Sequence, residues 1–225
     1  MVEWWSGEKG REEWLKKKIR NDDVEDREEE EEEHGGQTNT GGYEDLEQLG
    51  YLHVVHRKEE HQALVFIIGK YVRPEVHDRE RVLRHAMRKL VRLSEEDEQT
   101  MMKVVYINTQ ASPFENSPGF IWMLYTLSCV PKSLLERVEC VYVLHPTLSS
   151  VAFWSGLMPM ANALVLAAPV NVETVLRVEF LPKHARDIIA ASSGEGGIFQ
   201  FVVEEEAAMI DAMNYMPSPI NLATS

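Results

Sequence analysis

The sequence predicts an α/β fold, a mixed, mostly parallel five-stranded sheet covered by helices. Three observations lead to this class. Short apolar and β-branched runs of strand length recur along the chain. Segments of helix length separate most of them, which predicts crossovers between parallel strands. The first two runs, 51–57 and 63–69, are joined by only a few polar residues, and so short a connection predicts an antiparallel pair.

The predicted strands differ in how strongly apolar they are. YLHVVHRK alternates weakly, whereas ALVFIIGK at 63–70 is apolar throughout, as in strands buried on both faces. The other three predicted strands are KVVYINT at 103–109, CVYVLHP at 140–146 and TVLRVEF at 174–180. After the turn SSGEGG, the segment IFQFVV is predicted as a small strand or an extended segment.

The clearest predicted helix is DRERVLRHAMRKLVRLS at 78–94. Its apolar residues recur at helical spacing, and arginines and a lysine occupy the other side. Asp78 can cap its first turn. The other predicted helices are GFIWMLYTLSCV with Pro118 near its first turn, PKSLLER, SSVAFWSGLMPMANALVLAA, PKHARDIIAA and VEEEAAMIDAM.

Four regions are predicted along the 225 residues. They are a short amphipathic segment at 1–20, an acidic disordered linker at 21–42, a folded domain at 43–213 and a loose tail at 214–225. Disorder is expected in the linker because six consecutive glutamates repel one another and glycines add flexibility. The acidic run either is a solvated spacer or binds a basic partner. The tryptophans upstream belong either to the fringe of another domain or to a helix that docks on the main body.

Charge excludes two classes of partner. The formal net charge is -14, and residues 1–40 carry half of it. The remainder is mildly acidic and contains no basic stripe that could follow phosphates, so no nucleic acid is expected as a partner. Nothing polybasic indicates an anionic membrane surface.

The chain is expected to be cytoplasmic. The longest apolar stretch, 151–170, is interrupted by Pro159 and Asn162, so no transmembrane segment is predicted. Cys129 and Cys140 lack metal-binding spacing and are interpreted as apolar core thiols. No secretory signal is expected, because no apolar h-region lies near Met1.

The residue patterns predict neither an enzyme nor a cofactor or metal site. His53, His56 and His61 resemble a ligand pattern, but His53 and His56 point to opposite faces of a strand. SSGEGG lacks the lysine of a phosphate loop. The serine of Trp154-Ser155-Gly156 lacks the glycine two residues before it that a nucleophile elbow requires.

His145 ends a predicted strand at the edge where open α/β sheets bind ligands. Pro146 biases His145 toward extended geometry and ends the strand. We therefore interpret His145 as a structural corner, with a contact to a ligand or partner as the alternative and acid–base catalysis as the third reading.

Seven stretches occur in the order typical of the divergent CRAL-TRIO (Sec14-like) domains. They are DLEQLGYLHVV, ALVFIIGKYV, DRERVLRHAMRKL, KVVYINT, ENSPGFIWMLYTL, LLERVECVYVLHPT and VLRVEFLPKHARDI. The resemblance covers about residues 43–190 and is greatest to the BCH subgroup. Its most specific element is the run that ends in His145, Pro146 and Thr147.

This resemblance implies a noncatalytic fold with two possible functions. In the BCH subgroup the fold serves as a protein scaffold, which implies a partner such as a Rho-type GTPase or its regulator. In lipid-transfer relatives it holds a phospholipid or another hydrophobic molecule in a cleft, with Pro159 as a possible hinge of a lid. The alternative to a ligand cleft is that the large side chains after residue 147 fill the core. The candidate pocket residues are Trp122, Tyr125, His145, Phe153, Trp154, Leu157 and Met158.

Overall fold

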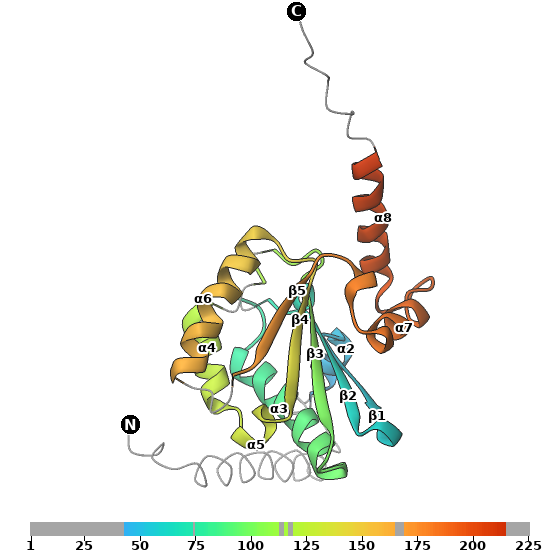
Figure 1. Cartoon of the computed structure of the whole chain (residues 1–225). Helices are drawn as coiled ribbons and strands as arrows, with labels where there is room; N and C mark the ends of the chain where they lie inside the picture. Colours follow the sequence, from blue (N-terminus) through green and yellow to red (C-terminus); the bar gives the residue numbers. More distant parts are fainter. Residues whose placement is uncertain (1–42, 74, 113–114, 117–118, 165–168, 215–225) are drawn as a thin grey trace, which may run out of the picture. The chain divides into compact units, whose positions relative to one another are not determined.

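The computed structural model describes residues 43–214 apart from 74, 113–114, 117–118 and 165–168 (Figure 1). The predictions for segment 1–20, for linker 21–42, for Pro118 and for nearly all of the tail lie outside the described residues. The chain divides into two units, Met1–Thr174 and Val175–Ser225.

Five strands form one sheet in the order β1-β2-β3-β4-β5. Strand β1 pairs antiparallel with β2, and the pairs β2–β3 and β3–β4 are parallel. This confirms the predicted fold class, including the antiparallel first pair. The strands are β1 (Leu52–Arg57), β2 (Gln62–Ile68), β3 (Met101–Ile107), β4 (Val138–Leu144) and β5 (Asn171–Val175).

Five α-helices of the first unit accompany these strands in the described residues. The predicted helices are confirmed with small shifts of their ends, and one short helix before β1 was not predicted. The helices are α2 (Glu44–Leu49), α3 (Arg79–Glu96), α4 (Phe120–Cys129), α5 (Lys132–Leu135) and α6 (Leu148–Leu164). The Asp78 side chain accepts a hydrogen bond from the amide of Glu80 at 3.0 Å, so the predicted cap of α3 is present.

One face of the sheet packs against α3 and α5. Ala63 of β2 and Met102 of β3 form a buried cluster with Met87 and Leu93 of α3 and Leu134 of α5. A second cluster joins α2 and β1 to the same helix. It comprises Leu46, Tyr51, Leu52, Val65 and Val82. Because side chains alternate along a strand, these contacts define the face on which α3 lies.

The alternate residues of β2 and β3 point to the opposite face and are also buried. Phe66 has no exposed surface, and Val105, its register partner on β3, has none either. Both faces of the central strands are therefore covered, which explains why β2 is apolar throughout.

The structure corrects two predictions near the carboxyl end. The fifth strand is Asn171–Val175 rather than 174–180, and Val178–Phe180 form a 3₁₀ turn. Val175 is buried, whereas Leu176 and Phe180 are exposed, so apolar character there does not reflect pairing in the sheet. The segment IFQFVV is not a strand, because α8 (Gln200–Asn214) begins within it.

The second unit contains that 3₁₀ turn, α7 (Lys183–Ala191) and α8. Its turn between the helices is closed by backbone hydrogen bonds from Gly197 to Gly194 at 2.7 Å and from Phe199 to Ser192 at 3.2 Å. The amide of Val178 donates to the Glu206 carboxylate of α8. Its buried apolar residues are Val175, Leu181, Ala185, Ile189, Phe199, Phe201 and Val202.

Candidate functional site

His145 lies at the end of β4, buried against the end of β3. Its ring nitrogen Nδ1 is 2.8 Å from the Thr109 hydroxyl, and its carbonyl accepts a hydrogen bond from the Asn108 amide at 3.1 Å. The backbone amide of Asn108 donates to the carbonyl of Leu144 at 3.0 Å. The strand ends at Leu144, just before the end that the sequence predicted, and the histidine joins the ends of two parallel strands.

The predicted extended geometry of His145 is wrong. Its φ is 51°, in the left-handed region, which histidine adopts more readily than most side chains. The two hydrogen bonds with β3 outweigh the local preference that the following proline imposes. Thr147 then caps α6, because its hydroxyl accepts from the amide of Ser150 at 3.2 Å and its amide donates to the Ser150 hydroxyl at 2.8 Å.

Replacement of His145 by alanine is expected to lower the free energy of unfolding by about 1–2 kcal/mol, because a buried hydrogen bond is lost. Urea denaturation measures the change. Thr109→Val removes the same bond from the other side and should cost a similar amount. His145→Gly should cost less than His145→Ala, because glycine tolerates a positive φ. Loss of partner binding at unchanged stability would contradict the corner interpretation.

A second buried polar residue ties loops together at this edge of the sheet. The Asn116 amide donates to the carbonyls of Lys70 and Val72 at 3.1 and 3.0 Å. Its side-chain oxygen accepts from the amide of Ser112 at 2.8 Å. Asn116 thus holds the segment that follows β2 against the loop that follows β3. Like His145, it uses its hydrogen-bonding groups for the fold.

Helices α4 and α6 form a layer without charged residues beside the sheet (Figure 1). Phe120 of α4 contacts Phe153 of α6 edge to face, with the ring centroids 6.1 Å apart. Trp154 contacts Tyr106 of β3 at 5.8 Å. Burial raises the pKa of Tyr106 to about 12, so its hydroxyl stays neutral. This aromatic cluster anchors α6 to both α4 and the sheet.

Large apolar side chains of the same two helices face the solvent. Ile121 is 83% exposed and Leu148 is 91% exposed, and Tyr125 is also exposed. Val151 and Met160 on α6 add to this set. We name these five residues the α4–α6 surface. Large exposed apolar side chains on two neighbouring helices are candidates for an interaction site.

The structure separates the candidate pocket residues into three groups. Leu157 is fully buried and His145 is nearly so, so both lie in the interior rather than on an open wall. Tyr125 is exposed. The remaining candidates are partly exposed, and they are Trp122, Phe153, Trp154 and Met158.

The exposed Ile121 and Leu148 were not among the predicted residues. The signal that could have found them is the uncharged character of both segments, since a helix that packs on only one side normally carries charge on the other.

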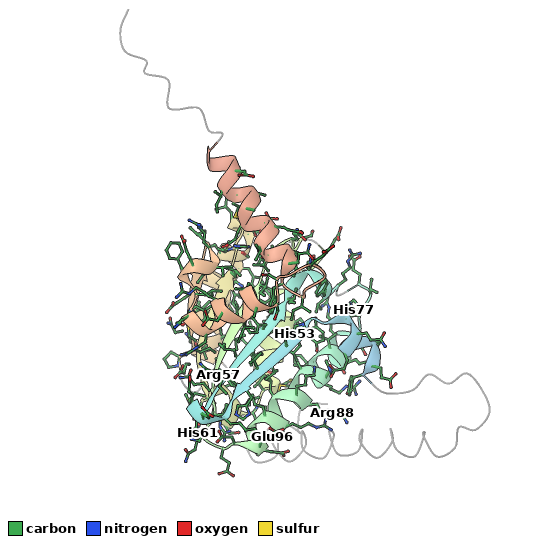
Figure 2. The ribbon with its side chains drawn as sticks, turned by 90° about the vertical axis from the view of Figure 1, so that its right-hand side faces the viewer. His53, Arg57, His61, His77, Arg88 and Glu96 are labelled. Atoms are coloured by element: carbon green, nitrogen blue, oxygen red, sulfur yellow. The ribbon has the colours of Figure 1, made fainter. Side chains whose placement is uncertain are left out.

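Two of the three histidines of the first hairpin lie beside the same carboxylate, because His56 Nε2 is 3.8 Å from Asp97, which also contacts His61. His53 Nε2 is 2.8 Å from the carbonyl of Gly50, whereas His61 Nδ1 is 2.8 Å from the Asp97 carboxylate. Figure 2 shows His53 and His61 at opposite ends of the hairpin. The hydrogen bond with His61 is the main reason that the pKa of Asp97 falls to about 2. Within the described residues, no group of three or more His, Cys, Asp or Glu side chains could hold a metal ion.

Two further sequence interpretations concern the thiols and the membrane. Cys129 and Cys140 are buried and are not joined in a disulfide, which confirms their interpretation as core thiols. None of the helices in the described part of the chain combines the length and the apolar character needed to cross a bilayer.

The helix-covered mixed sheet, with polar groups at its edge engaged in the fold, defines an α/β domain of the CRAL/TRIO type. A family model for the divergent CRAL/TRIO domain matches residues 60–193, which is more than half of the chain. The chain therefore belongs to the divergent CRAL/TRIO family, whose domains serve in general as binding modules. No curated protein matches the chain.

Proposed function

We propose that this chain is a noncatalytic binding domain of the BCH type that recognises a protein partner, such as a Rho-type GTPase or its regulator. Within the family, the sequence resembles the carboxyl-terminal domain of ganglioside-induced differentiation-associated protein 2. The proposed recognition site is the α4–α6 surface.

One observation carries this proposal, the exposure of large apolar side chains on two neighbouring helices that contain no charge. The cores of protein interfaces are depleted of charged residues, because a buried unpaired charge is costly. Ile121 and Leu148 each leave most of their side chain in water in the free domain. Burial of these side chains against a partner would stabilise the complex by removing that apolar area from water.

The expected result of Ile121→Asp combined with Leu148→Asp is a loss of partner affinity of at least about 30-fold, which corresponds to the loss of one interface hot spot. Titration calorimetry with purified Rho-type GTPases, loaded with GDP or with a GTP analogue, measures it. Both side chains are exposed, so the free energy of unfolding should change by no more than about 0.5 kcal/mol for each substitution.

Val76→Asp provides the matched control, because Val76 is a large apolar residue that is 71% exposed and lies outside α4 and α6. It should leave the affinity unchanged. Equal loss of affinity in the control and in the double variant would refute the α4–α6 surface as the recognition site.

A second candidate function is the binding of a phospholipid or another hydrophobic molecule. The observation that favours it is the partly exposed aromatic cluster of Phe153 and Trp154 next to Phe120. Aromatic side chains line most small-molecule sites, where a few polar groups set the orientation. Trp122 and Met158 would belong to the same site.

Native mass spectrometry of the purified chain, followed by solvent extraction, separates the two candidates. A lipid that co-purifies at one molecule per chain supports the second candidate. A chain that carries no such mass and binds a purified GTPase through the α4–α6 surface supports the first.

A further inference from the structure

Helix α3 carries basic side chains along one side, of which Arg92 is exposed and the others are partly exposed. Arg81, Arg84, Arg88 and Arg92 follow one another at intervals of three or four residues, so they share one side of the helix. Lys89 lies beside them. We name these five residues the α3 basic face. The sequence-based statement that no basic stripe exists is therefore wrong for this helix.

Acidic residues of α2 pair with two residues of the α3 basic face. Arg81 makes two hydrogen bonds of 2.7 Å with the Asp45 carboxylate, and they are the main reason that the pKa of Asp45 is lowered. Lys89 Nζ is 2.6 Å from the Glu47 carboxylate. Asp45 and Glu47 of α2 thus pair with Arg81 and Lys89, in a chain whose formal net charge is -14. The α3 basic face is a local exception to the charge of the whole protein.

The described chain begins on this face. The ring of Tyr43 lies under two guanidinium groups, 5.8 Å from that of Arg81 and 5.6 Å from that of Arg88. The same ring is 5.2 Å from the ring of His85. Figure 2 labels Arg88 on α3. Residues that precede Tyr43 in the sequence are therefore attached at the α3 basic face itself.

The most acidic part of the chain is attached there by a short connection. Residues 22–33 contain ten carboxylates and one arginine. The nine residues 34–42, HGGQTNTGG, join this segment to Tyr43. A glycine-rich linker of this length spans roughly 15–18 Å on average. The α3 basic face from Arg81 to Arg92 is about 17 Å long.

We propose that the acidic segment 22–33 docks on the α3 basic face of its own chain. Charge complementarity selects this occupant, and the short connection holds the segment at an effective concentration of the order of millimolar. The contact is a set of exposed ion pairs, so salt weakens it. The docked segment competes with any other anionic molecule for the same face. This contact is independent of the α4–α6 surface.

Carbodiimide crosslinking of the full chain tests the contact. The experiment uses a full-length variant with the substitutions Arg84→Lys and Arg92→Lys, which keep the positive charge and supply amines that react with the carbodiimide-activated carboxylates. At low salt, mass spectrometry of the digested protein should find crosslinks between these lysines and Glu28–Glu33. Lys89 with Glu47 is the internal positive control, because their charged groups are already in contact. Lys132 is the comparison amine, because it belongs to another helix, α5.

The expected yield of crosslinks from α3 to Glu28–Glu33 is at least about five-fold higher than from Lys132. It should fall by a similar factor in 1 M salt, where the screening length is about 3 Å. Equal yields for all exposed lysines would overturn the proposal. In a mixture of isotope-labelled and unlabelled chains, crosslinks only between chains would assign the face to the acidic segment of a second copy and would also overturn it.

Vesicle binding tests the competition. In a chain with the six substitutions Glu28→Gln to Glu33→Gln, the α3 basic face should bind phosphatidylserine-containing vesicles at least about five-fold more tightly than in the wild type, because millimolar competition is removed. Vesicles of phosphatidylcholine alone are the control. Equal binding of wild type and variant would show that the segment does not occupy the face, and would overturn the proposal.

Discussion

Replacement of Phe66 by alanine is expected to lower the free energy of unfolding by about 3–5 kcal/mol. Phe66 has no exposed surface and lies in the middle of β2, between His53 of β1 and Val105 of β3. Removal of its ring takes apolar area out of the core and leaves a cavity that the paired backbones on both sides prevent from closing. Urea denaturation followed by circular dichroism measures the loss.

Phe180→Ala is the matched control, because it removes the same atoms from a side chain that is 65% exposed. Its expected cost is no more than about 0.5 kcal/mol. Because both variants replace phenylalanine by alanine, the difference between their losses of stability measures the effect of burial. If the two variants lost the same stability, the assignment of Phe66 to the core would be wrong.

Replacement of Gly197 by alanine is expected to destabilise the second unit by about 3 kcal/mol. A Cβ atom at this position would lie 2.2 Å from the Ser192 carbonyl oxygen and 2.8 Å from that of Gly194. Both oxygens belong to the backbone of the turn that Gly197 and Phe199 close, so neither can rotate away. Hydrogen exchange should accelerate at the amides of α7 and α8 in the variant.

Gly194→Ala is the control in the same turn. Among the described residues, no atom lies within 4 Å of a Cβ built on Gly194. Its effect should stay within about 0.5 kcal/mol, since the substitution adds no clash. A Gly197→Ala protein with the stability and exchange rates of Gly194→Ala would show that the turn has room for a side chain.

Much of the fold follows from local patterns. The antiparallel first pair, the two parallel pairs and the extent of α3 agree with the periodicity of the sequence, because an amphipathic helix or a buried strand repeats its pattern within a few residues. The failures lie where the local signal is ambiguous. Residues 176–180 and 198–203 are short apolar runs, and such a run fits a strand, a turn or the start of a helix equally well.

The candidate site was less predictable from the sequence than the fold, because it depends more on tertiary contacts. The sequence placed His145 at the end of a strand but predicted the wrong backbone geometry, because Thr109 and Asn108 that hold it are distant in sequence. Leu157 was a candidate pocket residue and is core, whereas Ile121 was overlooked and is exposed. In a helix apolar on all sides, periodicity does not distinguish the packed side from the solvent side.

The sequence by itself determined the class of fold, the charge-free character of α4 and α6 and the acidic character of the amino-terminal region. These are properties of composition and of short-range pattern. Only the tertiary structure decided which apolar side chains face water, what holds His145 and that Tyr43 lies on the basic side of α3. Burial and contact depend on residues far apart in the chain, which come together only when the sheet and its helices pack.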